Sequence, residues 1–265
     1  MRCVTWNVNS LKARQERVEA WLAANAPDVC CLQETKCADA AFPAAAFSSL
    51  GYESVHHGNG RWNGVAILSR VGLADEQAGF FDDAAGSVEE CRIVAATCAG
   101  VRVVCVYVPN GRTVGSEHYA AKLAWLARLR EELGRIRGES VVCGDFNIAP
   151  ADADVFDPAA FIGATHVTAD ERAALGAILE RGFVDSLRHL HPAGPGPFTW
   201  WDYRAGAFHK GQGMRIDLAL CTPGIATRLT GAWVDRDARK KGSLDSSPSD
   251  HAPLVIEWDS DGAAH

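Results

Sequence analysis

Residues 140–150 read Ser-Val-Val-Cys-Gly-Asp-Phe-Asn-Ile-Ala-Pro, and the fold prediction starts from this stretch. Its apolar first half predicts a short buried strand. The strand ends on Asp145 and Asn147, two residues apart, and strand ends in open α/β sheets are where ligands bind. Glycine, aspartate and asparagine also form turns, so this stretch alone is equally consistent with a turn and with a binding site.

The 265-residue chain has the composition of a soluble globular protein, with 48% hydrophobic and 22% charged residues. Its length suits one large domain or two small ones. No apolar run approaches the roughly 20 residues that a membrane helix needs. The N-terminal residues begin like a strand and lack the apolar segment of a signal peptide, so we expect no membrane association.

The formal net charge of −7 argues against a protein that binds nucleic acid passively, because nonspecific affinity for a polyanion rests on Lys and Arg. It does not exclude a nucleic-acid enzyme, since a divalent cation can offset acidic groups in an active site. The nine cysteines form no Cys-x-x-Cys pair, and most lie in apolar runs. We interpret them as buried free thiols, typical of a reducing compartment such as the cytoplasm.

Strands alternate with occasional helices along the chain. Besides the opening strand, the pattern predicts strands at residues 2–8, 28–34, 64–69, 92–97, 101–108, 198–203, 214–220, 232–235 and 252–258. It predicts an irregular loop at residues 148–166 and helices at residues 11–24, 117–133 and 168–181, the last with Thr168 and Glu171 as a capping box. Strands outnumber helices and several form hairpins, which favours an α/β (α+β) sandwich over a doubly wound parallel sheet.

Polar side chains stand at the end of almost every predicted strand. They are Asn7, Glu34, Tyr107, Asn110, Asp145, Asn147, Asp217, Asp250 and His251. Most of them have a plain structural explanation, as turn residues, helix entries or surface groups. Asp217 resists that explanation because it lies in an apolar run, where an unpaired carboxylate is costly to bury. His251 is its candidate partner.

Together these residue types suit one kind of chemistry. Carboxylate and amide oxygens are hard ligands that prefer Mg²⁺ or Mn²⁺ to zinc. A His–Asp pair holds an imidazolium beside developing negative charge, and a tyrosine hydroxyl or an asparagine amide serves a phosphate oxygen or an attacking water. The sequence has no P-loop, no Gly-x-Gly-x-x-Gly and no Gly-x-Ser-x-Gly motif. It therefore indicates metal-assisted phosphodiester hydrolysis.

Seven motifs occur in order along nearly the whole chain. They are TWNVNSLKAR, CLQETK, YVPNG, GDFNIAP, FTWWDYR, MRIDLAL and SDHAPL. In this order they resemble the exodeoxyribonuclease III branch of the endonuclease/exonuclease/phosphatase superfamily, whose members are apurinic/apyrimidinic (AP) endonucleases with 3′-repair activity. The resemblance implies a four-layer, DNase I-like fold with two packed mixed sheets between helices. It implies one domain at residues 1–258 and a flexible tail at residues 259–265.

The resemblance implies an essential Mg²⁺, with Mn²⁺ as a substitute, bound by Glu34. One or two ions are implied. The other residues implied as ligands or close neighbours are Asn7, Asp145, Asn147, Asp250 and His251.

The resemblance also implies catalytic roles. Asp145 activates or orients the attacking water, and Asn147 assists it. Tyr107 contacts the scissile phosphate or the leaving group, while His251, oriented by Asp217, stabilises the pentacovalent transition state. The physical chemistry agrees, because a cation and an imidazolium stabilise negative charge where it develops, and a nearby carboxylate keeps a histidine protonated. Whether Asp145 or His251 takes the proton of the water is left open.

Trp200, Met214 and Ile216 match the family's pocket for a sugar that lacks its base. Apolar walls suit a flipped-out deoxyribose and exclude a normal nucleotide by size. Alternatively, Trp200 and Trp201 fill the core on opposite faces of a strand, and we expect one to point inward and one toward DNA.

Asn110 and Arg112 are candidate contacts to the substrate. Lys240 and Lys241 are also candidates for phosphate contacts, although a solvated surface is the favoured interpretation of this pair. The implied partner is double-stranded DNA with 3′ ends or abasic sites. The implied setting is a monomer in the cytoplasm, associated with the nucleoid.

His166 departs from the family pattern. At this position, before VTADER, members that cleave efficiently at abasic sites usually carry a small residue. A bulky side chain there would narrow the sugar pocket or wedge the duplex. We therefore predict a Mg²⁺-dependent 3′–5′ exodeoxyribonuclease that trims 3′ ends, with an AP endonuclease activity reduced by His166.

Two alternatives stay open at this point. One is another phosphodiesterase of the same superfamily, such as a sphingomyelinase, an inositol-phosphate phosphatase or a DNase I-like nuclease. The other is a regulator that keeps this fold without catalysis. The QETK and FTWWDYR motifs favour the repair branch over the first, and the filled catalytic positions favour an enzyme over the second.

Overall fold

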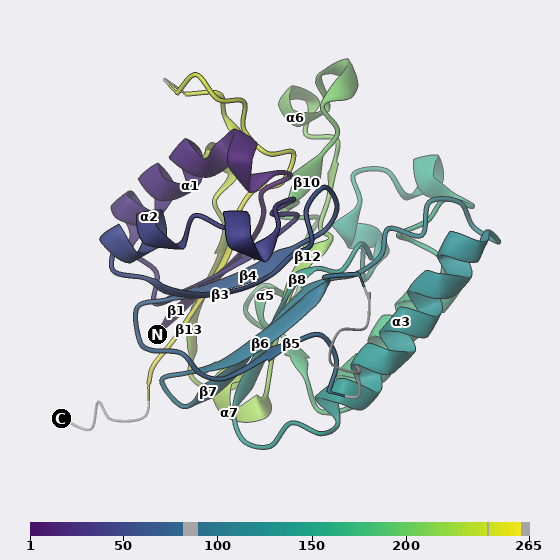
Figure 1. The fold of residues 1–265 in the computed structure, drawn as a ribbon. Helices are drawn as coiled ribbons and strands as arrows, with labels where there is room; N and C mark the ends of the chain where they lie inside the picture. The colour runs from purple at the N-terminus through teal and green to yellow at the C-terminus, as the bar shows by residue number, and fades with distance from the viewer. Residues whose placement is uncertain (82–89, 243, 261–265) are drawn as a thin grey trace.

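A computed structural model describes residues 1–81, 90–242 and 244–260 of the chain. Two six-stranded mixed sheets pack face to face, and helices cover their outer faces (Figure 1). The four-layer sandwich predicted from the sequence is confirmed.

The first sheet has the strand order β13-β14-β1-β2-β4-β3. Its strands are β1 Arg2–Asn7, β2 Val29–Gln33, β3 Glu53–His57, β4 Val65–Ser69, β13 Leu229–Val234 and β14 Leu254–Trp258. β1 and β2 run parallel at the centre of the sheet, and every other neighbouring pair is antiparallel. Helix α1, Leu11–Asn25, makes the crossover that this parallel pair requires.

The second sheet repeats this plan with the order β5-β6-β7-β8-β12-β9. Its strands are β5 Ala74–Ala78, β6 Ile93–Cys98, β7 Val101–Tyr107, β8 Ser140–Asp145, β9 Val184–Asp185 and β12 Asp217–Cys221. β7 and β8 are its parallel pair, connected through helix α3, Glu117–Leu133. A separate two-stranded ribbon joins β10 Trp200–Trp201 to β11 Gly213–Met214.

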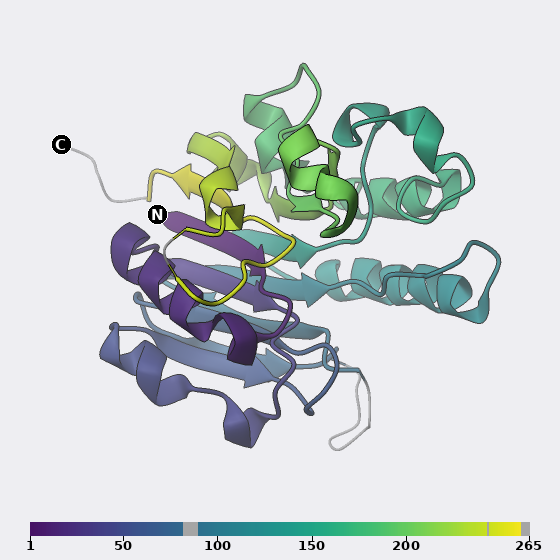
Figure 2. The ribbon, with the colours of Figure 1, turned by 90° about the horizontal axis from the view of Figure 1, so that it is seen from above.

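Two helical layers enclose the sheets, as the view from above shows (Figure 2). On the first sheet, Leu11, Val18 and Leu22 of α1 pack onto the outer faces of β1 and β2. On the second sheet, α3 and α4, Ala169–Leu179, bury Leu126 and Ile178 against β7, β8 and β12. The shorter helices are α2 Ala44–Ser49, α5 Ser186–Leu190, α6 Ala207–Lys210 and α7 Pro223–Ala226.

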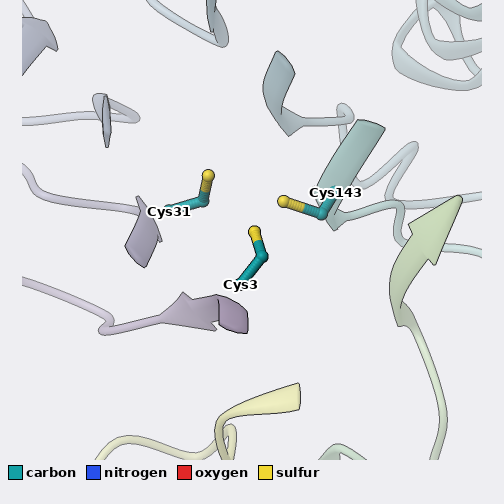
Figure 3. A group of neighbouring side chains, drawn as sticks. All are labelled: Cys3, Cys31 and Cys143. Atoms are coloured by element: carbon teal, nitrogen blue, oxygen red, sulfur yellow. The ribbon is translucent and has the colours of Figure 1, made fainter. Parts of the chain in front are cut away.

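The core between the two sheets is rich in small apolar residues and cysteine. Cys3, Cys31 and Cys143 point toward one another from β1, β2 and β8 (Figure 3), with their sulfur atoms all within 4.8 Å. Each is at most 1% exposed, and all nine cysteines of the chain carry free thiols. A buried thiol behaves as a small hydrophobe, so these sulfurs fill the narrow space between facing strands. The prediction of buried free thiols is confirmed for eight of the nine cysteines, and Cys37 is half-buried.

Several predicted elements differ from the observed ones. The predicted strand at residues 198–203 is reduced to β10, and that at residues 214–220 is divided into β11 and β12. β3 and β5 were not predicted because they are edge strands; β5 reads ADEQA and is largely exposed, so it lacks an apolar alternation. The predicted loop at residues 148–166 contains two 3₁₀ turns, η2 Asp152–Asp154 and η3 Pro158–Phe161. The capping box of Thr168 and Glu171 is confirmed.

The topology brings the polar strand ends to one edge of the sandwich. β1, β2, β7 and β8 end there, since each pair is parallel. β12 runs antiparallel to β8 with Asp217 opposite Asp145, so its first residue lies at the same edge. β14 runs antiparallel to β1, which places the residues that precede it, including His251, beside the end of β1.

Among the residues that the structure describes, no helix has both the length and the apolar character to cross a membrane. Strand β14 ends at Trp258, and Asp259 is bonded through its backbone to Arg228. The predicted tail at residues 259–265 lies outside the described residues from position 261 onward.

A buried ion network fixes the loop at residues 148–166 to the second sheet. Arg215, fully buried, donates from Nε and Nη2 to the two carboxylate oxygens of Asp154 at 2.7 and 3.1 Å, and from Nη1 to Asp185 at 2.8 Å. Arg188 donates to Asp154 as well. Burial alone would raise the pKa of Asp154, but the hydrogen bonds and charges of Arg215 and Arg188 lower it.

We expect Asp154→Asn to destabilise the protein in a pH-dependent manner. A lowered carboxyl pKa contributes stability that is complete above the ordinary value of 3.8 and is lost as the pH falls through the folded-state pKa. Urea unfolding at pH 7 should show a loss of about 3 kcal/mol, as for other broken buried pairs, and the loss should shrink at pH 3.

Asp152→Asn is the matched control for Asp154→Asn. Asp152 lies in the same 3₁₀ turn, and its carboxylate is 71% exposed where it pairs with Arg172. We expect it to change stability by less than about 1 kcal/mol. An equal loss from Asp154→Asn at both pH values would contradict the role of the charge.

Candidate active site

A cavity of about 220 Å³ opens at the edge where the strand ends meet. Its lining consists of Glu34, Tyr107, Asn110, Asp145, Asn147, His166, Trp200, Met214, Ile216, Asp250 and His251. Every one of these residues was a candidate from the sequence. Of the other candidates, Asn7 and Asp217 lie one layer behind the lining, and Arg112 lies outside it as an exposed residue.

Asp217, His251 and Asp145 form a buried line of acid, imidazole and acid. His251 Nδ1 and Asp217 Oδ2 are 2.8 Å apart, while His251 Nε2 is 3.8 Å from Asp145 Oδ2. All three side chains are at most 4% exposed. The register between β8 and β12 places Asp217 opposite Asp145. His251, the partner predicted for the buried Asp217, is hydrogen-bonded to it.

The charges along this line shift the pKa of both groups that face the cavity. Burial alone would lower the pKa of His251, but the charge and hydrogen bond of Asp217, helped by Asp145 and Asp250, raise it to about 10. Burial raises the pKa of Asp145 to about 7, against the lowering effect of His251. Near pH 7, His251 is therefore an imidazolium, while Asp145 exchanges a proton readily.

Glu34 and Asp145 are joined by the side chain of Asn7 at the end of β1. Asn7 Nδ2 donates to Glu34 Oε1 at 2.8 Å and to Asp145 Oδ2 at 2.9 Å. On the other side of Glu34, the ammonium of Lys36 lies 2.8 Å from Oε2 and 2.6 Å from Asn9 Oδ1. A cation is thus already favoured beside Glu34. Lys36 was not predicted as a site residue, because the QETK motif in which it lies was used only for the family resemblance.

Asp250 is held at the rim of the cavity by two donors. Asn9 Nδ2 lies 3.0 Å from its Oδ1, and Trp200 Nε1 lies 3.0 Å from its Oδ2. Burial would raise the pKa of Asp250, but the charge of His251 and these two hydrogen bonds lower it. Asp250 therefore stays ionised. Asn9 was not predicted as a site residue from the sequence, although it lies only two positions after Asn7.

Asn147 reaches its place because β8 packs very close to β7 at Gly144 and because the backbone after the strand becomes left-handed at Asn147. Gly144 has φ 154°, and a Cβ there would lie 1.8 Å from the carbonyl oxygen of Val106, so only glycine allows β7 this close. Asn147 itself has φ 51°. Its backbone N–H donates to Asp145 Oδ1 at 2.9 Å, and Asn110 Nδ2 donates to its side-chain oxygen at 3.1 Å. Gly144 and Asp145 belong to β8, so the turn interpretation of residues 144–147 is wrong for its first half, and only Asn147 lies at a bend after the strand.

Tyr107 and Trp200 form two further walls of the cavity. Burial and the charges of Glu34 and Asp145 raise the pKa of Tyr107, so its hydroxyl keeps its proton. The guanidinium of Arg92 lies 4.8 Å from the centre of the Tyr107 ring. Trp200 faces the cavity while Trp201 is 2% exposed, which confirms that one tryptophan points inward and the other does not.

His166 lines the cavity together with the apolar residues Met214 and Ile216. Its backbone has φ 80°, a conformation that favours glycine. Its Nδ1 lies 2.6 Å from the carbonyl oxygen of Asn147, and its Nε2 lies 3.5 Å from Asn110 Nδ2. Burial, with the positive charge of Lys122, lowers the pKa of His166 to about 4, so the ring is neutral and donates from Nδ1 to the carbonyl.

The donor set fits a hard divalent cation. Ligand atoms of Glu34, Asp145 and His251 lie within 4.8 Å of one another. Carboxylate oxygens suit Mg²⁺ or Mn²⁺. An imidazolium has no lone pair to give, so in this state His251 would act as a hydrogen-bond donor and the carboxylates of Glu34 and Asp145 would hold the cation. The Asn7 side-chain oxygen accepts from the Asn9 backbone N–H at 2.9 Å and points away from both carboxylates.

Arg112, Lys240 and Lys241 do not line the cavity. All three are exposed, and Lys240 forms an ion pair with Asp237 at 2.7 Å. The solvated-surface interpretation of the lysine pair agrees with these positions.

Comparison with known proteins matches this fold and site to one family. The model of the endonuclease/exonuclease/phosphatase family matches residues 4–251. Exodeoxyribonuclease III of Haemophilus influenzae is 32% identical over 272 residues, which covers 97% of this chain and 100% of the relative.

Solved structures give the same result. An AP endonuclease from Archaeoglobus fulgidus is 39% identical with a TM-score of 0.91, over 98% of this chain and all of the other. The 3′–5′ exonuclease NExo of Neisseria meningitidis is 41% identical with a TM-score of 0.92 at the same coverage. NExo, named a 3′ phosphatase, is also known bound to a product DNA hairpin, with a TM-score of 0.91. The chain belongs to the endonuclease/exonuclease/phosphatase family.

Proposed function

We propose that this protein is a metal-dependent DNA repair nuclease that acts mainly on the 3′ ends of duplex DNA and has a weaker AP endonuclease activity. The observation that carries the proposal is the convergence of Glu34, Asp145 and an Asp217-supported His251 within one small cavity. Relatives named exodeoxyribonuclease III, AP endonuclease and 3′ phosphatase support DNA as the substrate.

The residues of the chain divide the reaction between them. Asp145 accepts the proton of the attacking water, while the backbone N–H of Asn147 fixes one of its oxygens. His251 donates from Nε2 to a phosphoryl oxygen as negative charge develops there. Tyr107, still protonated, donates to the phosphate or the leaving oxygen.

A divalent cation at Glu34 and Asp145 would supply Lewis-acid stabilisation of the phosphoryl oxygens. Lys36 adds a fixed positive charge next to Glu34. Together these charges let an acidic protein hold a phosphodiester at this edge.

His166 supports the preference for 3′ ends. Its ring lines the same small cavity as Met214 and Ile216, which a base-less sugar flipped out of the duplex would enter. A nucleotide at the 3′ end of a DNA strand approaches the phosphate site from that free end. It therefore depends less on the part of the cavity that His166 occupies. NExo, a 3′–5′ exonuclease by name, shares 41% of its sequence with this chain, in agreement with the proposed preference.

The nuclease activity is tested directly with a duplex that carries a recessed 3′ end. We expect Mg²⁺-dependent release of nucleotides that stops with EDTA and returns with added Mg²⁺ or Mn²⁺. Asp145→Asn keeps the shape of the side chain but removes the proton acceptor, and should lower kcat at least 100-fold, at the lower end of what general acid–base catalysis supplies. Release that continues in EDTA, or in Asp145→Asn, would sink the proposed mechanism.

Asp217→Asn tests the role of the acid behind His251. The amide preserves the hydrogen-bonding geometry but withdraws the charge that holds the imidazolium. We expect kcat on the same duplex to fall about 100-fold with a KM within threefold, because the lost interaction strengthens in the transition state. A matched control is Asp235→Asn, which removes a carboxylate bonded to Trp21 away from the cavity and should leave kcat unchanged. A loss confined to KM would contradict the assignment.

His166→Gly tests the proposed specificity. Glycine suits the positive φ at this position and opens the apolar side of the cavity, so we expect cleavage of an internal abasic duplex to rise at least about tenfold. Release from a 3′-recessed duplex should change by less than threefold. His166→Ala separates side-chain bulk from backbone conformation, because it removes the ring without easing φ. Abasic cleavage that is the same in wild type and His166→Gly disproves the specificity proposal.

A further inference from the structure

A buried ion pair lies directly behind the cavity and has no part in the chemistry above. Lys122 of α3 and Glu171 of α4 are both 0% exposed, and Lys122 Nζ donates to Glu171 Oε1. Removing two charges from water is costly and is repaid only when their remaining hydrogen-bonding groups are satisfied. The question is therefore what the pair is bonded to.

Lys122 reaches two of the segments that line the cavity. Its Nζ donates to the carbonyl oxygen of Asn147 at 2.7 Å and to that of Asn110 at 3.3 Å. Its stem packs under Gly111, where an added Cβ would lie 2.9 Å from Lys122 Cδ. The ammonium thus holds the two asparagine-bearing turns after β7 and β8 against each other.

Glu171 contacts a third segment at the cavity, the one that contains Thr165 and His166. Its Oε1 accepts from the backbone N–H of His166 at 3.0 Å and from Thr165 Oγ1 at 2.7 Å. Its Oε2 accepts from the Thr168 backbone N–H at 3.1 Å as part of the capping box. A capping glutamate needs only this last contact, so the bonds to residues 165 and 166 are additional.

The backbone that the pair holds is strained. Asn147 has φ 51° and His166 has φ 80°, a region that residues other than glycine occupy rarely, histidine more rarely than asparagine. Asn147 and His166 also share one anchor, since the Asn147 carbonyl accepts from both Lys122 Nζ and His166 Nδ1. Strained backbone persists only where its surroundings fix it, and the pair supplies donors and an acceptor at these points.

We propose that Lys122 and Glu171 are positioning residues that hold Asn147 and His166 in the conformations that set turnover and the choice between 3′ ends and abasic sites. Neither residue lines the cavity, so both act through the backbone. The proposal rests on the proposed nuclease function for its activity readouts. A purely structural tie between α3 and α4 would predict loss of stability without a selective change in catalysis.

Lys122→Met removes the donor while keeping most of the side-chain volume. On the 3′-recessed duplex we expect kcat to fall about 10–100-fold with KM within threefold, since small misplacements of catalytic groups have effects of this size. The ratio of abasic to 3′-end cleavage should rise, because His166 loses part of its anchor. Glu171→Gln is the second variant; it keeps an acceptor oxygen and the shape, and should change kcat in the same direction.

Glu132→Gln is the matched control. Glu132 is a carboxylate on the same helix α3, 8% exposed, and it accepts from Gln77 and from the backbone N–H of Phe81. The Glu132→Gln variant should have a lower melting temperature than the wild type, with a kcat changed by no more than twofold. A fall in kcat in Glu132→Gln that equals the fall in Lys122→Met would overturn the proposal.

Amide hydrogen exchange gives a readout that does not depend on nuclease activity. In Lys122→Met, residues 145–149 and 165–168 should exchange at least about tenfold faster than in Glu132→Gln, since local opening follows lost backbone anchors. If wild type releases nothing from DNA, the proposed function fails and this comparison still decides the positioning role. Equal exchange in the two variants would overturn it.

Discussion

The buried bond between Asp217 and His251 is the interaction on which the site depends. It spans the two sheets, because Asp217 begins β12 of the second sheet and His251 precedes β14 of the first. A carboxylate buried this deeply is stable only beside a positive charge, and an imidazolium at the cavity is stable only beside a carboxylate. The fold and the chemistry therefore constrain each other. The two sheets cannot slide without separating the pair, and the site cannot lose its charge without leaving a buried ion unpaired.

The remaining groups follow from strand direction. A parallel pair at the centre of each sheet brings four strand ends to one edge, and antiparallel neighbours add two strand beginnings there. This edge collects more acidic groups than basic ones, in a chain whose formal net charge is −7. A phosphodiester is repelled by such a surface unless positive charge is placed at the point of reaction. Lys36, His251 and a divalent cation at Glu34 are the groups suited to that task, so affinity and catalysis are concentrated in the same few ångströms.

Much of the site could be predicted from the sequence because its residues follow apolar runs. A strand pattern identifies its own end, and an acid in an apolar run such as Asp217 demands a partner. Arrangements that depend on tertiary contacts could not be predicted in this way. Lys122 and Glu171 fit the patterns of a helix residue and a capping residue, and nothing in their spacing shows that they meet behind the cavity. Lys36 and Asn9 lie in turns whose direction is set by other strands. The edge strand β5 is largely exposed, β3 is only half-buried, and both are rich in polar residues, so the apolar alternation that identifies a strand is absent there.

His166 shows how residues behind the cavity can stabilise an unusual residue in its lining. At φ 80° glycine is the least costly residue, and a histidine is held there only against its own preference. The cost is offset by the hydrogen bond from its ring to Asn147 and by that from its backbone to Glu171. A family position that accepts a small residue can accept a bulky one once such anchors exist. We propose that substrate choice in this protein depends both on the His166 side chain in the cavity and on the buried ion pair of Lys122 and Glu171 that stabilises its conformation.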